Sequence, residues 1–393
     1  MTIQHSFLAL ALLAGSGAAL AQGHHHPGRD ASLGTSAAVD PQGRLWIART
    51  EPASQGAYVV LQSTTDMGKT WSAPQRVQQE PETIEAAGES APKIAFGPAG
   101  QVYVSYTHPL GKPYTGAIRF ARSLDGGKSF SAPATVHADR AIATHRFDSL
   151  IVDRSGRVYV SWIDKRDAEA ARARKQPYAG AAVYYAGSDD AGASFKGDYK
   201  LADHSCECCR IALALDPAGT PVALYRAVYG KNVRDHAIAP LSADGKPAEP
   251  VRATFDDWHI DACPHHGPGL AFAADGTRHQ VWFDVTRAQG GVFYASAPPS
   301  GKPGKPVRLG SDQAEHADVA VDGAHIAIVW KQFDGEATAI LLRHSADGGR
   351  TWQEKTLART AANSDHPHLL RTPSGIVLVW RTQDEGVRVL PAI

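Results

Sequence analysis

The four cysteines of this 393-residue chain lie in two short segments. The first segment reads Cys206-Glu207-Cys208-Cys209-Arg210, and the second reads Cys263-Pro264-His265-His266. Thiolate sulfur is a preferred ligand of Cu(I) and Zn(II), and imidazole nitrogen suits copper and zinc. If the fold brings the two segments together, we expect them to bind a transition metal, with copper favoured and zinc as the alternative. The candidate ligands are Cys206, Cys208, Cys209, Cys263, His265 and His266.

The elements that must position these segments repeat along the chain. Seven copies of one unit each contain an apolar strand, a glycine turn and a second strand, from residues 36–49 to residues 368–382. Alternating Val, Tyr and Trp around a glycine turn is typical of a β-hairpin, and hairpins repeated at roughly 50 residues match four-stranded propeller blades. We therefore predict an all-β propeller with seven blades favoured and six as the alternative. The last repeat has room for only about three strands, and a strand near residues 27–34 could complete that blade and close the ring. The turn glycines are Gly43, Gly100, Gly156, Gly219, Gly276, Gly323 and Gly375.

A second motif lies between the hairpins and has the form Ser/Thr-x-Asp-x-Gly-x-Ser/Thr-aromatic. Its aspartate can accept hydrogen bonds from nearby backbone N–H groups, while the glycine adopts the left-handed conformation that the turn needs. The four copies resemble the Asp-box, or bacterial neuraminidase repeat, of the sialidase superfamily, and this resemblance implies a sialidase-like propeller. The copies begin at Thr64, Ser123, Ser188 and Ser345.

The same resemblance implies a catalytic set that this chain carries only in part. Sialidases use an arginine triad, a late tyrosine nucleophile paired with a glutamate, and an aspartate acid/base. Here the first-blade arginine position reads Gly34-Thr35-Ser36-Ala37, and no tyrosine follows Tyr294. We therefore expect divergence from true sialidases. The remaining candidates for a catalytic or anion-binding site are Arg146, Asp148, Asp164, Arg210 and Arg381.

The repeat also predicts where the candidate ligands meet. In a propeller, the residues that precede the innermost strand of each blade converge on the central channel, and we call these segments the channel loops. Both cysteine segments are channel loops of neighbouring blades, and His145 and His316 are further candidate ligands in other channel loops. Oxidation is the open alternative, because a disulfide could join Cys206 to Cys263 and leave Cys208 and Cys209 as a vicinal pair.

The amino terminus has the pattern of an export signal. An apolar stretch covers residues 7–20, and Ala19-Leu20-Ala21 is the small-x-small pattern of a cleavage site. We expect residues 1–21 to be a signal peptide, 22–33 a His-rich segment and 34–393 one propeller domain, periplasmic or secreted. Cleavage after Ala21 would place His24 third in the chain, where its imidazole, the free amine and two amides could bind Cu(II).

Composition restricts the partners. Forty Lys+Arg balance forty Asp+Glu, so the totals do not favour nucleic acid, and no apolar run beyond the amino terminus is long enough to insert in a membrane. We expect a monomer that binds a metal ion or a small-molecule or glycan ligand. Three functions remain open. They are metal binding or handling, an exo-sialidase-like glycoside hydrolase or carbohydrate-binding protein, and a protein-interaction scaffold with disulfide-stiffened loops.

Overall fold

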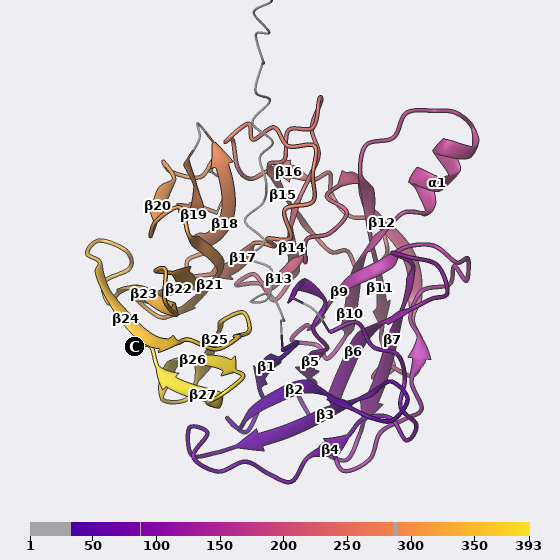
Figure 1. Ribbon diagram of the computed structural model, residues 1–393. Helices are drawn as coiled ribbons and strands as arrows, with labels where there is room; N and C mark the ends of the chain where they lie inside the picture. The colour runs from indigo at the N-terminus through magenta and orange to yellow at the C-terminus, as the bar shows by residue number, and fades with distance from the viewer. Residues whose placement is uncertain (1–32, 87, 287–288, 300) are drawn as a thin grey trace, which may run out of the picture.

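The strands form a ring of seven antiparallel sheets around a central axis (Figure 1). The computed structural model describes residues 33–393 except residues 87, 287–288 and 300. In this part of the chain, six sheets have four strands and the last has three, and neighbours in each sheet are consecutive in sequence. The prediction of a seven-bladed all-β propeller is confirmed.

Each blade begins with its innermost strand and ends with the strand at its outer edge. Blade 1 contains β1 (Ser36–Val39), β2 (Leu45–Pro52), β3 (Ala57–Thr64) and β4 (Gln75–Arg76). Blade 2 contains β5 (Lys93–Phe96), β6 (Val102–Pro109), β7 (Gly116–Ser123) and β8 (Ala134–Thr135), preceded by the 3-10 turn η1 (Gly88–Ser90). Blade 3 contains β9 (His145–Val152), β10 (Val158–Asp164), helix α1 (Arg166–Ala173), β11 (Ala181–Ser188) and β12 (Lys196–Ser205).

The remaining blades continue the same order. Blade 4 contains β13 (Ala212–Leu215), β14 (Pro221–Arg226), β15 (His236–Pro240) and β16 (Val251–Arg252). Blade 5 contains β17 (Gly269–Phe272), β18 (Arg278–Thr286), β19 (Gln289–Ala297) and β20 (Val307–Leu309). Blade 6 contains β21 (Ala314–Asp322), β22 (His325–Phe333), β23 (Thr338–Ser345) and β24 (Gln353–Thr360). Blade 7 contains β25 (His368–Thr372), β26 (Gly375–Thr382) and β27 (Gly386–Pro391).

Local sequence explains these hairpins. All seven turn glycines of the repeat have a positive φ, a conformation that costs a side-chain-bearing residue about 1–2 kcal/mol. In the Asp-x-Gly motif of blade 2, Asp125 Oδ1 accepts the backbone N–H of Ser129 at 3.0 Å, and Asp125 Oδ2 accepts the Ser129 hydroxyl. The same bonds recur at Asp66, Asp190 and Asp347. The motif therefore acts as a turn between the third and fourth strands of a blade.

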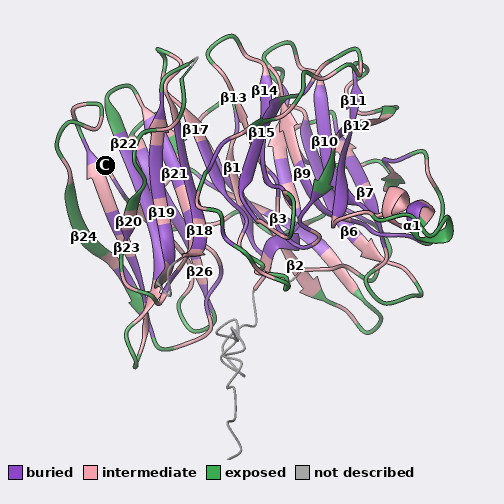
Figure 2. Cartoon of the chain, turned by 90° about the horizontal axis from the view of Figure 1, so that it is seen from above, coloured by how far each residue is buried: buried purple, intermediate pink, exposed green. Residues whose placement is uncertain are grey.

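The hydrophobic core lies between the blades, as the buried strands in Figure 2 show. In the described part of the chain, seven apolar clusters correspond to the seven interfaces between neighbouring blades. Trp162, Trp330 and Trp380 occupy equivalent places in the second strands of three blades and are fully buried. Side chains on the two faces of each sheet thus hold the blades in a fixed order around the axis.

The ring closes between blades 7 and 1, whose innermost strands β25 and β1 are neighbours. The backbone N–H of Thr35 donates to Asp365 Oδ2 at 2.6 Å, the Thr35 carbonyl lies 2.9 Å from His368 Nε2, and Arg381 donates to the Leu33 carbonyl at 3.1 Å. The sequence suggested that a strand near residues 27–34 completes blade 7. Residues 27–32 lie outside the described part, and Leu33 and Gly34 are not in a strand.

The export signal and the His-rich segment cannot be compared with the structure. Residues 1–32, which include His24 and nearly all of both segments, lie outside the described part of the chain. Among the described residues, no helix combines the length and the apolar character needed to cross a bilayer.

Candidate metal centre

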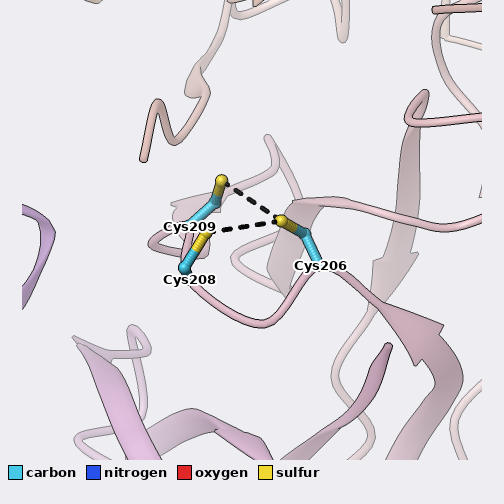
Figure 3. A group of neighbouring side chains, drawn as sticks. All are labelled: Cys206, Cys208 and Cys209. Atoms are coloured by element: carbon cyan, nitrogen blue, oxygen red, sulfur yellow. Dashed lines mark hydrogen bonds between the residues drawn. The ribbon is translucent and has the colours of Figure 1, made fainter. Parts of the chain in front are cut away.

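The loop between β12 and β13 brings three thiols to one point. Cys206 Sγ lies 3.8 Å from Cys208 Sγ and 3.5 Å from Cys209 Sγ, and Figure 3 shows the three sulfurs turned toward one another. All three side chains are buried within the apolar cluster between blades 3 and 4. The backbone N–H of Cys206 donates to the Arg226 carbonyl at 2.8 Å, which anchors the start of the loop to the end of β14.

The fourth thiol comes from the channel loop of the next blade. Cys263 precedes β17, and its thiol interacts with that of Cys208. Unlike the other three cysteines, Cys263 is exposed to solvent. The predicted meeting of the two cysteine segments is therefore present in the structure, with three thiols inside and one at the surface.

Charge around the sulfurs favours one thiolate in particular. Hydrogen bonds from Cys208 and Cys209 lower the pKa of Cys206, and the cationic Arg226 and Arg234 add to this effect. The hydrogen bond to Cys206 raises the pKa of Cys208, whereas burial is the main cause that raises the pKa of Cys209. Negative charge in the cluster thus concentrates on Cys206, and thiolate is the form of cysteine that binds metals.

The cysteines are not oxidised in the structure. All four are free, and the Cys206 to Cys209 sulfur separation of 3.5 Å is far longer than the S–S bond of about 2.05 Å. The alternative bridge between Cys206 and Cys263 is not present, since Cys263 interacts with Cys208 and Cys206 lies against Cys209. The disulfide-stiffened loops of the scaffold alternative are therefore absent among the described residues.

The two histidines of the second segment, His265 and His266, differ in how far they are exposed to solvent. His265 is exposed and has a left-handed backbone with φ of 55°. The His266 ring instead stacks on Phe283 with a centroid separation of 4.0 Å and lies 4.6 Å from the ring of His316. Adjacent residues in one loop thus point to solvent and to the channel, which the spacing in sequence could not distinguish.

The other candidate histidines lie in different surroundings. His145 is fully buried between Gly116 and Asp139, and its ring stacks on that of His137 at 3.9 Å. His316 lies against Glu89 and His366 in the channel. These partners are carboxylates, backbone and other imidazoles, so the structure places both histidines apart from the sulfur cluster.

The candidate catalytic residues are each paired with neighbouring groups. Arg146 forms an ion pair with Glu85, and Arg210 forms one with Glu89 at 2.8 Å, while Arg381 binds backbone at the ring closure. Asp148 accepts hydrogen bonds from Ser105 and Thr107, and Asp164 accepts bonds from Trp162 and Arg166. These contacts join neighbouring strands and blades.

The structure shows a group that the sequence patterns did not single out. Asp235, Asp256 and Asp284 bring carboxylate oxygens within 4.8 Å of one another near the ends of blades 4 and 5. Asp284 is 1% exposed, and neither of its carboxylate oxygens has a hydrogen-bond partner among the described residues. Burial, followed by the negative charge of Asp256, raises the pKa of Asp284 to about 8. The repeated Trp-x-Asp at residues 162–164 and 282–284 is the sequence signal for this position.

A cavity elsewhere is not related to these groups. It has a volume of about 400 Å³ and is lined by residues of blades 2 and 3, including Phe120, Arg122 and Phe195. Because none of the candidate ligands or catalytic residues lines it, the cavity does not extend the candidate site.

Comparison with known proteins supports the fold. No protein-family model matches the chain, and no curated protein sequence matches it significantly. Among solved structures, a PL25 ulvan lyase is similar with a TM-score of 0.57 and 13% identity, covering 92% of this chain and 94% of the lyase. The polysaccharide lyase Uly1 is similar with a TM-score of 0.54 and 8% identity, covering 92% of this chain and 88% of that one.

A glycosidase shows the same architecture. The GH93 α-L-arabinofuranosidase of Fusarium graminearum is similar with a TM-score of 0.52 and 13% identity, covering 76% of this chain and 87% of that enzyme. At these identities the likeness shows a shared propeller fold and nothing finer. Membership of the sialidase superfamily stays a prediction.

Proposed function

We propose that this protein binds a soft transition metal, Cu(I) before Zn(II), at the cluster of Cys206, Cys208, Cys209 and Cys263, and that it serves in metal binding or handling. The observation that carries the proposal is the convergence of three buried sulfurs from one loop with a fourth thiol from the next blade. Three clustered thiols with a fourth beside Cys208 form a donor set of the kind that Cu(I) and Zn(II) prefer.

The sulfur separations support a shared ion. Two sulfurs bound to one metal at about 2.3 Å in a tetrahedral arrangement are about 3.8 Å apart. The separations of 3.8 Å and 3.5 Å from Cys206 to Cys208 and Cys209 match this arrangement without a large movement of the loop. The thiols would lose their protons when they bind the metal ion.

Burial and charge also favour this function. The apolar surroundings of Cys206, Cys208 and Cys209 exclude water, and the nearby guanidinium groups of Arg226 and Arg234 offset part of the negative charge of the thiolates. Cys263 is exposed, so it can receive an ion from solvent or from a donor and pass it inward by ligand exchange. This combination suits a protein that binds and transfers metal.

Anaerobic titration with Cu(I) against a chromogenic chelator tests the proposal. The reduced wild-type chain should bind one Cu(I) that protects thiols from titration, and Cys208→Ser/Cys209→Ser should lose this binding. His325→Gln, at an exposed residue of β22, is the control that should retain it. If all four thiols of the wild-type chain react equally with and without Cu(I), the proposal is refuted, whatever the folding of the variant.

A carbohydrate ligand at the channel face is the second candidate function. The lyases and the arabinofuranosidase that share the fold at a TM-score above 0.5 are named for action on polysaccharides or arabinosides. In this chain Glu89 and Arg210 lie together in the channel, and a sugar hydroxyl could bind such groups. Hydrolysis or cleavage of a sialoside, an arabinan or ulvan that Arg210→Ala abolishes and chelators do not affect would favour this function over metal binding.

A further inference from the structure

Residues from five blades converge on the carboxylate of Glu89. This residue lies in η1 before blade 2 and is 3% exposed. Its Oε2 accepts the backbone N–H groups of Arg210 at 2.9 Å and Gly267 at 2.7 Å, and its Oε1 accepts Arg210 Nη1 at 2.8 Å. Blades 2, 4 and 5 therefore hold the carboxylate in one orientation.

Two imidazoles from the next blades face the same oxygen. Nδ1 of His316 lies 3.8 Å from Glu89 Oε1, and Nδ1 of His366 lies 3.7 Å from it. The two rings stack with centroids 3.7 Å apart, and His266 approaches His316 from blade 5. These separations are too long for hydrogen bonds, and Nδ1 of His316 is buried without a hydrogen-bond partner among the described residues.

The backbone holds His316 in this position. Its φ of 46° is left-handed, and a bulge between Glu315 and Asp318 interrupts the pairing of β21 with β22. A bulge turns a side chain away from the direction that a regular strand would give it. The other ring nitrogen of His316, Nε2, lies 3.7 Å from Glu315 Oε2. A carboxylate behind the second nitrogen of a ligating histidine is the usual outer shell of a metal site.

We infer that Glu89, His316 and His366 form a divalent transition-metal site on the axis of the propeller, separate from the thiol cluster. Each Nδ1 lies 3.7–3.8 Å from Glu89 Oε1, a separation that lets nitrogen and oxygen share an ion at about 2.2 Å from each, close to the bond lengths of Zn(II). The two rings are stacked, so ion binding would turn them until both Nδ1 lone pairs face the ion. One carboxylate and two imidazoles suit borderline ions such as Zn(II), Co(II) or Fe(II), whereas the four thiols suit Cu(I).

Titration of the full chain with Co(II) tests this inference and separates the two sites. Cobalt bound to thiolates gives a sulfur-to-metal charge-transfer band, whereas cobalt bound to nitrogen and oxygen does not. We expect His316→Gln/His366→Gln to bind one Co(II) fewer than the wild-type chain while the charge-transfer band is unchanged. His325→Gln should bind as much Co(II) as the wild-type chain.

Two outcomes would overturn the inference. One is an unchanged stoichiometry in His316→Gln/His366→Gln, and the other is a loss of the charge-transfer band together with the lost ion, which would mean a single shared site. The wild-type chain provides a measurement that does not depend on the folding of a variant. Proton NMR of the Co(II)-loaded chain should show two exchangeable imidazole signals shifted far from the diamagnetic range, and their absence would also refute the axial site.

Discussion

Replacement of Asp284 by asparagine should remove a large pH dependence of stability. The Asp284 carboxyl is 1% exposed, its two oxygens have no hydrogen-bond partner within the described part of the chain, and its pKa is raised to about 8, first by burial and then by the charge of Asp256. The folded state therefore keeps a proton that the unfolded state loses near pH 4. The free energy of unfolding should decrease as the pH rises through this interval, because the unfolded state binds fewer protons.

The size of the effect follows from the shift of the pKa. At about 1.4 kcal/mol for each pH unit, a change from 3.8 to about 8 makes the Asp284 contribution fall by about 4 kcal/mol between about pH 5 and about pH 8. The amide that replaces the carboxyl in the variant carries no charge at either pH. We expect Asp284→Asn to be more stable than the wild-type chain at the higher pH and to differ much less at the lower pH.

Urea denaturation in metal-free buffer at both pH values measures this difference. Asp164 provides a matched control, because it occupies the same repeat position and is fully buried, but it accepts bonds from Trp162 and Arg166. Asp164→Asn should destabilise the protein at both pH values, since it removes the buried carboxylate of an ion pair with Arg166, which then keeps only its outer partners such as Asp198. If the difference between wild type and Asp284→Asn does not change with pH, or changes in the opposite direction, the reasoning is wrong.

Three further predictions concern the ring itself and can be measured by thermal and urea denaturation. Glu89→Ala should destabilise by about 3–5 kcal/mol, because it leaves the half-buried Arg210 guanidinium without its carboxylate and two backbone N–H groups without their acceptor. Glu89→Gln should cost less because it keeps an acceptor, and equal losses would contradict this account. Gly180→Ala should lower the free energy of unfolding by about 2 kcal/mol or more, because φ is +68° and the added Cβ would lie 2.1 Å from the Ser205 carbonyl oxygen. Gly111→Ala is the control, and it should be neutral because the space around Gly111 is open. Trp380→Ala should cost about 3–5 kcal/mol by opening a cavity between blades 6 and 7, and a loss below about 1 kcal/mol would show that the interface rearranges.

The repeat made the fold predictable from local patterns. Each turn glycine, each Asp-x-Gly turn and each alternating strand depends on interactions within a few residues, so the spacing of the motifs was enough to count blades. The order of blades also predicted that the segments of Cys206 and Cys263 are neighbours, and in the structure the thiols of Cys208 and Cys263 interact. The closure of blade 7 was predicted less well, because Thr35 and Arg381 meet through single hydrogen bonds that no local pattern encodes.

Only the tertiary structure decided which side chains share a site. The sequence placed His265, His266 and His316 in channel loops, but a loop residue can point to solvent, to a neighbouring blade or to the axis, depending on backbone angles set by distant contacts. His265 turns outward, whereas His316 turns toward Glu89, a residue more than two hundred positions away in the chain. Repeats of local turns therefore determined the architecture, and the packing of blades around one axis determined the chemistry, because ligand geometry depends on ångström-scale placement of residues that are remote in sequence.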